Sequence, residues 1–226
     1  MLIKEIVLYT SVDFDTLKIY YTDLLGLKVL KEKSNVISFS VGSSILTFEK
    51  NTDYEDPVYH FAFNIPSNKF KEAKKYLTTS GIELLSLDGS DEFDFKSWNA
   101  HSIYFYDPAG NILEFISRHN LENDSDQKFS GDSILNISEI GLPVKNVYEF
   151  YKEIQKNLGT PYFSGDKTTF TALGDDNGLF IIVNTGRIWF PDCGHAEEYP
   201  LRVIVSSDLL KDFIFKYSEY RIISET

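Results

Sequence analysis

Hydrophobic and polar residues follow a pattern whose period changes repeatedly along the chain. The apolar run at residues 6–9 predicts a strand, and apolar positions at helical spacing over residues 14–25 predict a helix that Gly26 ends. Two short strands are predicted next, at residues 36–41 and 44–49. The pattern therefore defines a unit in which a strand, a helix and further strands follow one another.

The strand and the helix of this unit return three more times. Strands are predicted at residues 60–65, 137–144 and 201–205, and each precedes apolar residues at helical spacing. Ser67 is the expected N-terminal cap of the first of these helices. The apolar faces of the three helices comprise Phe70, Ala73, Tyr76 and Leu77, then Val147, Phe150, Tyr151, Ile154 and Leu158, and finally Leu210, Phe213 and Tyr217. Such repetition indicates a fold built from one supersecondary unit.

Predicted hairpins complete most of the repeats. Residues 35–49 and 169–183 each place a glycine-containing turn between two apolar strands. Residues 101–117 form a longer predicted hairpin around the Asp-Pro-Ala-Gly-Asn turn at 107–111. No such hairpin follows the helix of the fourth unit, where one strand is predicted at 220–224, so we expect the second half of the chain to be incomplete.

The segment 121–132 divides the repeats into two halves. It is polar and acidic and has no period, which is typical of a linker. We therefore predict two domains, residues 1–120 and residues 133–226, each made of two units that pair with one another.

Composition and charge narrow the functions open to the chain. Hydrophobic residues make up 42% of the sequence, which suffices for a sizeable core, and a net charge of -12 disfavours nucleic acids and anionic membranes as partners. Cys193 is the single cysteine, so no internal disulfide can form. Residues 1–5 show no signal-peptide pattern, and no apolar run is long enough to span a bilayer. We expect a cytoplasmic protein with a small-molecule partner.

Four segments of the sequence resemble the vicinal oxygen chelate superfamily, which includes glyoxalases, bleomycin-resistance proteins and extradiol dioxygenases. The segments are Ile3–Thr10, Tyr20–Val29, His60–Pro66 and Ser102–Phe115, and the last contains the DPxGNxxE pattern that is typical of the superfamily. The resemblance covers residues 1–118 well and the second half more loosely. It implies an α+β fold in which paired βαβββ modules form curved, half-open mixed sheets with the helices outside.

The resemblance also implies a metal site inside the curve of the sheet. The ligand positions of the superfamily correspond here to Glu5, Ile45, His60 and Glu114. Glu5, His60 and Glu114 would offer one imidazole and two carboxylates to a divalent ion such as iron, manganese, zinc or nickel. A metal would also balance Glu114, which sits in an apolar strand where an unpaired charge is costly. Ile45 is apolar, so the four-ligand site of glyoxalase I is not available.

The second half of the chain offers fewer ligands. Glu139 occupies the first ligand position of that half, but Pro200 occupies the other. We therefore expect any metal site to lie within residues 1–118.

Other residues are candidates for proton transfer or for covering a pocket. His101 and Tyr104 lie on the strand that leads into the 107–111 turn, and one of them could face the cavity as an acid or base; a packed tyrosine and an exposed histidine are the simpler alternative. The acidic segment 89–99, which contains Phe93, Phe95 and Trp98, could form a lid or an ordinary loop. We assign no chemical role to residues 187–190, which include Arg187, Trp189 and Phe190. We expect them to seal the contact between the two halves.

Three functions are compatible with these observations. The first is a metal-dependent enzyme whose metal binds two oxygens of a small substrate, with ring-cleaving dioxygenase chemistry favoured over lyase or isomerase chemistry because Ile45 removes the fourth ligand. The second is a metal-free protein that binds a small molecule such as an antibiotic. It is favoured by the departures from the superfamily pattern at Glu5, where histidine is more common, and at Ile45, and by an aromatic content of 15%. The third is a scaffold or regulatory subunit that associates, for example as a homodimer, through an exposed strand edge.

Overall fold

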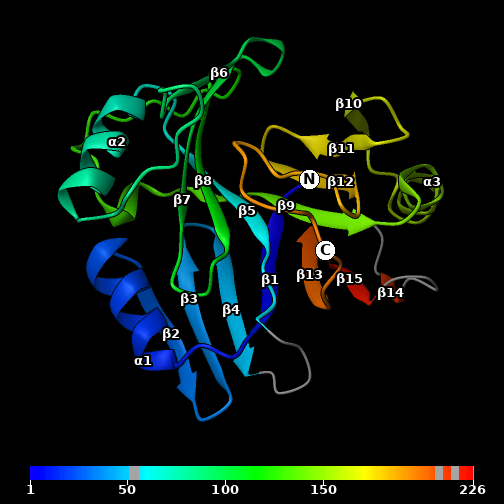
Figure 1. Ribbon diagram of the computed structural model, residues 1–226, viewed down its shortest axis with the longest axis horizontal. Helices are drawn as coiled ribbons and strands as arrows, with labels where there is room; N and C mark the ends of the chain where they lie inside the picture. Colours follow the sequence, from blue (N-terminus) through cyan, green and yellow to red (C-terminus); the bar gives the residue numbers. More distant parts are fainter. Residues whose placement is uncertain (51–55, 207–210, 215–218, 226) are drawn as a thin grey trace.

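Three segments of the chain form the predicted βαβββ module (Figure 1). The computed structural model describes residues 1–50, 56–206, 211–214 and 219–225. The first module contains β1 (Ile3–Thr10), α1 (Phe14–Lys18) continued by the π-helix η1 (Ile19–Leu24), β2 (Lys28–Lys33), β3 (Val36–Val41) and β4 (Ser44–Lys50). Its first and last strands run parallel, and β2, β3 and β4 pair antiparallel.

The second and third modules repeat this arrangement. The second contains β5 (His60–Ile65), α2 (Phe70–Thr79), β6 (Phe93–Phe95), the 3-10 turn η2 (Lys96–Trp98), β7 (Ala100–Tyr106) and β8 (Ile112–Arg118). The third follows the 3-10 turn η3 (Gly131–Ser133) and contains β9 (Asn136–Val144), α3 (Val147–Leu158), β10 (Tyr162–Gly165), β11 (Phe170–Asp175) and β12 (Gly178–Asn184). Again the first strand of each module runs parallel to the last.

The fourth module differs from its prediction. It contains β13 (Leu201–Ser206), β14 (Lys211–Ile214) and β15 (Tyr220–Glu225), so the predicted strand at 220–224 is confirmed. The predicted helix is wrong at residues 211–214, which pair antiparallel with β15, while Leu210 and Tyr217 lie outside the described residues. Apolar spacing over so short a window is compatible with a helix or a strand. Residues 211–214 form a strand because they hydrogen-bond to β15.

The modules pair across the two predicted halves. β5 runs antiparallel to β9, which joins the second module to the third, and β1 runs antiparallel to β13, which joins the first to the fourth. The strand order is β14-β15-β13-β1-β9-β5-β8-β7-β6 within one mixed sheet, with β4 branching from β1 and β12 from β9. The expectation that modules pair within residues 1–120 and within residues 133–226 is therefore wrong.

The helices cover the sheet with their apolar faces, as the sequence predicts. Buried residues of α2 and α3 fall at the predicted positions, and α3 ends at Gly159 with a positive φ of 65°. Ser67 does not cap α2, because its hydroxyl bonds Asp124 in the segment 121–132 instead. No helix of the described chain is long and apolar enough to cross a bilayer.

The turn at 107–111 ties the second module to the first. The buried carboxylate of Asp107 accepts hydrogen bonds from the backbone amides of Ala109 and Asn111, both at 2.9 Å, and from the side-chain amide of Asn111 at 2.8 Å. It also accepts a 2.6 Å hydrogen bond from the hydroxyl of Tyr21, which lies on η1. One carboxylate thus holds the turn closed and anchors it to the helix of the neighbouring module.

The same turn sets the register between β5 and β8. The side-chain oxygen of Asn111 accepts a 2.8 Å hydrogen bond from the backbone amide of Tyr59, one residue before β5 begins. β5 and β8 then start side by side, with His60 opposite Ile112. This contact decides which residues of β5 and β8 lie next to one another.

We expect the substitution Asp107→Ala to lower the free energy of unfolding by about 3 kcal/mol or more, because it leaves the Tyr21 hydroxyl and the amides of the turn without their buried acceptor. Tyr21→Phe removes one of these hydrogen bonds and should lower it by about 1 kcal/mol. Urea unfolding followed by circular dichroism measures both. Equal and small effects of the two substitutions would show that Asp107 does not organise the turn.

Candidate metal centre and ligand cavity

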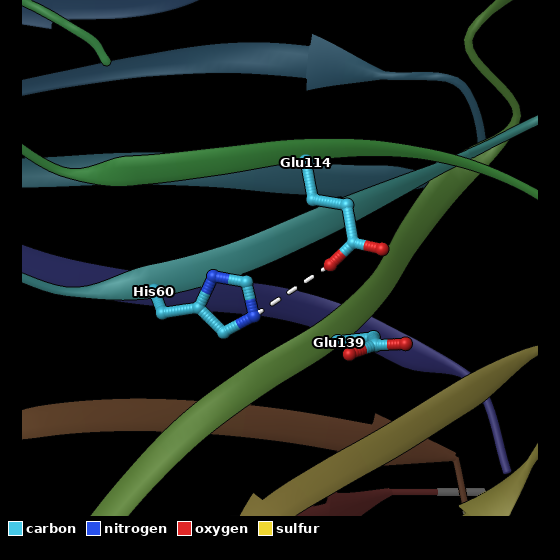
Figure 2. Close-up of side chains that lie close together, drawn as sticks. All are labelled: His60, Glu114 and Glu139. Carbon is cyan, nitrogen blue, oxygen red and sulfur yellow. Dashed lines mark ion pairs between the residues drawn. The ribbon is translucent and has the colours of Figure 1, made fainter. Parts of the chain in front are cut away.

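Two glutamates and a histidine meet on one face of the sheet (Figure 2). Ala62 on β5 pairs with Glu114 on β8 and with Glu139 on β9, so the carboxylates flank one small side chain in a single row. His60 precedes Ala62 by two residues, and strand alternation directs it to the same face. Ligand atoms of His60, Glu114 and Glu139 lie within 4.8 Å of one another.

His60 presents a free nitrogen to this cluster. Its Nδ1 donates a 3.1 Å hydrogen bond to the backbone carbonyl of Ile112, which leaves the lone pair on Nε2. Nε2 lies 3.7 Å from Oε2 of Glu114. Burial lowers the pKa of His60 to about 4, so the ring is neutral at neutral pH. A neutral imidazole whose other nitrogen is held by a carbonyl is the form in which histidine binds metals.

Glu114 is buried without a full positive partner. The residue is 2% exposed, and its carboxyl group accepts hydrogen bonds from the hydroxyls of Ser102 and Tyr104. Burial raises the pKa of Glu114 to about 8, and the nearby charge of Glu139 adds to the effect. At neutral pH the metal-free protein therefore keeps a proton on this carboxyl group.

Glu139 has a cation beside it. The fully buried guanidinium of Arg118 donates to Oε1 of Glu139, and its Nε donates to Ser138 at 3.2 Å. Nη1 of Arg118 lies 3.5 Å from a carboxylate oxygen of Asp176. Burial raises the pKa of Glu139, while Arg118 opposes the rise. Arg118 therefore lies beside the carboxylates of Glu139 and Asp176, and its charge acts on Glu114 only from a distance, without an ion pair.

The groups at and beside the cluster include more carboxyl groups than cations. Glu114, Glu139 and Asp176 provide three carboxyl groups, against the single guanidinium of Arg118 and a neutral His60. A divalent cation between His60, Glu114 and Glu139 would supply the missing charge, and this set of nitrogen and oxygen ligands suits iron, manganese or zinc. The residues present therefore fit a divalent metal, and a proton on Glu114 is the alternative.

Two of the three predicted ligands converge, and Glu5 does not join them. Glu5 lies on β1 in the first module, where its Oε1 accepts a 2.6 Å hydrogen bond from the hydroxyl of Thr47. Glu139 takes the third place, although the sequence argument set it aside because of Pro200. A lone carboxylate in the largely apolar run Ile137–Val144 was the available signal, and it is the signal that was applied to Glu114.

The fourth position around the cluster is apolar. On β5, the residue two places after His60 pairs with Glu114; on β9, the residue two places after Glu139 is Gly141, which pairs with Ile181. Ile181 in the third module therefore corresponds to Glu114 in the second module, and it occupies the position where a fourth ligand would lie. Among the residues that the structure describes, the cluster therefore offers three protein ligands.

Tyr104 and His101 lie on opposite sides of the sheet. Tyr104 pairs with Glu114 on β8 and reaches the cluster, whereas His101 packs against Phe70 of α2 and contacts His119. Positions 101 and 104 differ by an odd number, so strand alternation directs their side chains to different faces. His101 is therefore removed from the candidate site.

An aromatic cavity of about 280 Å³ opens above the cluster. Gly141 makes room for one wall, because a Cβ atom there would lie 2.8 Å from the ring of Trp189, which itself lies 4.9 Å from the ring of His60. The segment 89–99 supplies Phe95 and Trp98, and the segment 187–190 also lines the cavity. The lining comprises His60, Phe95, Trp98, Tyr104, Glu114, Ile116, Glu139, Phe170, Ile181, Val183, Arg187, Trp189 and Phe190.

The strand pairing places the chain among proteins with the vicinal oxygen chelate fold, as the sequence resemblance predicted. A solved structure of a candidate dioxygenase from Bacillus subtilis matches with a TM-score of 0.68 and 14% identity over 99% of this chain and 85% of that one. A glyoxalase I variant from Zea mays matches with a TM-score of 0.60 and 12% identity over 99% and 92%. No family model and no curated protein matches the sequence. At these identities the likeness concerns the fold.

We expect the metal-free protein to lose stability as the pH rises from 6.5 to 8. Glu114 binds its proton more tightly when folded, with a pKa of about 8, than when unfolded, so its contribution is lost as the pH approaches 8. His60, whose pKa falls from 6.5 to about 4 on folding, acts in the opposite direction and only below pH 6.5. The free energy of unfolding should therefore fall by on the order of 1–2 kcal/mol across this window.

Urea unfolding at pH 6.5 and pH 8, with a chelator present, measures this change. Glu114→Gln should abolish most of it, because the amide stays neutral at both values. Glu83→Gln alters an exposed carboxylate and serves as the matched control. An unchanged pH dependence in Glu114→Gln would mean that Glu114 is already ionised at pH 6.5.

Proposed function

We propose that this protein is a metal-dependent enzyme of the vicinal oxygen chelate type, acting on a small substrate that binds the metal through two oxygens. The observation that carries the proposal is the convergence of His60, Glu114 and Glu139 at the floor of the cavity, where carboxylates outnumber cations. The fold shared with a candidate dioxygenase and with a glyoxalase I is consistent with it.

The three residues would hold the ion through Nε2 of His60 and one oxygen of each glutamate. When bound, the metal supplies a Lewis acid that stabilises negative charge on the substrate oxygens. Arg118 keeps Glu139 in place by donating to its other oxygen, and Ser102 does the same for Glu114. These contacts orient the carboxylates before any substrate arrives.

Tyr104 would act as a hydrogen-bond donor beside the substrate. Burial, together with the charges of Glu114 and Glu139, holds the pKa of Tyr104 well above its ordinary value, so the phenol keeps its proton. Its side chain lines the cavity next to Glu114. A neutral phenol in this position can donate a hydrogen bond to a substrate oxygen, whereas it cannot serve as a base at neutral pH.

Ring cleavage with dioxygen is the chemistry we favour within this class. In that reaction one dioxygen molecule is consumed and both of its atoms enter the ring-opened product. His60, Glu114 and Glu139 would hold the metal as three protein ligands, which is the number found in three-ligand iron oxygenases that bind both substrate and dioxygen. The aromatic walls suit a planar ring, and Ile181 takes the place of the additional carboxylate that a two-base isomerisation would need.

A metal-free binding protein of the same fold is the second candidate. The observation that favours it is that the cluster can be satisfied without an ion. Arg118 pairs with Glu139, and Glu114 keeps a proton with Ser102 and Tyr104 as hydrogen-bond donors. In this case the aromatic cavity would sequester a ligand without altering it.

Titration of the purified, chelator-treated protein with manganese, nickel, zinc and, without oxygen, ferrous iron decides between the two. We expect at least one ion to bind in a 1:1 ratio, to raise the melting temperature and to release protons below pH 8, because the metal displaces the proton of Glu114. His60→Ala and Glu114→Gln should each weaken binding at least about 100-fold.

Glu5→Gln is the matched control, because Glu5 is a carboxylate of the same sheet that lies outside the cluster. It should leave metal affinity unchanged. Failure of all four ions to bind would eliminate the metal-dependent enzyme in favour of the binding protein.

A further inference from the structure

Arg187 is the positively charged residue in the wall of the cavity. It follows β12, is exposed to solvent, and its guanidinium carbon lies 5.3 Å from the centre of the Phe170 ring, another lining residue. His60 is the other basic residue of the lining, and its ring is neutral at neutral pH. Any negative charge on a ligand would therefore find its counterpart at Arg187.

The guanidinium of Arg187 forms no ion pair within the part of the chain that the structure describes. Arg118 and Arg202, in contrast, pair with Glu139 and Glu49. Arg187 contacts Phe170 through the flat face of its guanidinium group. The N–H groups at the edge of that group remain available as hydrogen-bond donors. Arg187 can therefore bind a carboxylate through two parallel hydrogen bonds.

The charge of the whole protein makes this cation notable. The chain carries a net charge of -12, so its general field repels anions. An anionic ligand would be held only where a local cation outweighs that field. In the cavity, Arg187 is placed to do so, while the buried carboxylates below it disfavour an anion at the floor.

The walls and the size of the cavity describe the rest of the ligand. Phe95, Trp98, Phe170, Trp189 and Phe190 provide aromatic faces, which pack well against a planar ring. A volume of about 280 Å³ lies at the lower end of small-molecule pockets, so one substituted ring fits better than a drug-sized molecule.

From these features we infer that the cavity takes a single-ring aromatic acid, with the ring between the aromatic walls, the carboxylate on Arg187 and the metal-binding oxygens at His60, Glu114 and Glu139. The exposure of Arg187 and the burial of the cluster place the two polar ends at opposite depths of the cavity. This inference rests on the proposed function for the inner end of the ligand, and Arg187 is a specificity residue that lies apart from the candidate metal ligands.

The two tryptophans of the chain give a direct test, because Trp98 and Trp189 are its only ones and both line the cavity. Quenching of their fluorescence reports binding of 3,4-dihydroxybenzoate and of 3,4-dihydroxybenzamide, which share the ring and the hydroxyls but differ in charge. The titrations are run without oxygen, with and without added manganese. We expect the acid to bind at least about tenfold more tightly than the amide.

Variants assign this preference to one residue. Arg187→Gln should raise the Kd of the acid at least about tenfold and change that of the amide less than about twofold, whereas Arg187→Lys should retain part of the preference. Lys152→Gln removes the same charge from the exposed face of α3 and should change neither Kd.

Equal affinity for the acid and the amide in the wild-type protein, or equal weakening of both by Arg187→Gln, would overturn the inference. So would the absence of quenching by either compound. An acid preference that persists in a protein unable to bind metal would support Arg187 while refuting the metal-dependent enzyme. Metal binding without an acid preference would support the metal-dependent enzyme and refute the role of Arg187.

Discussion

The antiparallel pairing of β5 with β9 is the contact on which the candidate site depends. It brings Glu139 of the third module into the same row as Ala62 and Glu114 of the second. A shift by one residue would turn Glu139 to the other face, because side chains alternate along a strand. The turn at 107–111 places Glu114 beside Ala62 in this row, because Asn111 holds the start of β5 beside the start of β8.

This pairing gathers ionisable groups at buried positions. Arg118 offsets part of the cost by serving Glu139 and Asp176, and the hydroxyls of Ser102 and Tyr104 satisfy Glu114 without neutralising it. The remaining imbalance is met either by a proton or by a cation, and the two compete for the same oxygen atoms. The features that make the site unfavourable for a bare carboxylate therefore also favour a metal ion.

Both paired modules contribute to the cavity above this row. The second module supplies Phe95 and Trp98, and the third supplies Phe170, Trp189 and Arg187. Gly141 allows the Trp189 ring to lie against His60, so the aromatic wall and the polar floor meet at one point. A ligand in the cavity would contact both modules, and its recognition depends on their pairing as much as on any single side chain.

Local pattern in the sequence determined most of the elements, including the first strand of each module, three of the helices and the hairpin around 107–111, because periodicity and turn residues act over a few positions. The short strands β2, β6 and β10 were not predicted. The sequence also identified His60 and Glu114 through the motifs that contain them. Only the tertiary structure decided that Glu139 joins them and Glu5 does not, and that residues 211–214 form a strand. Each of these outcomes depends on which strands hydrogen-bond to each other across long stretches of chain, and the repeated modules are similar enough that local spacing favours no particular partner.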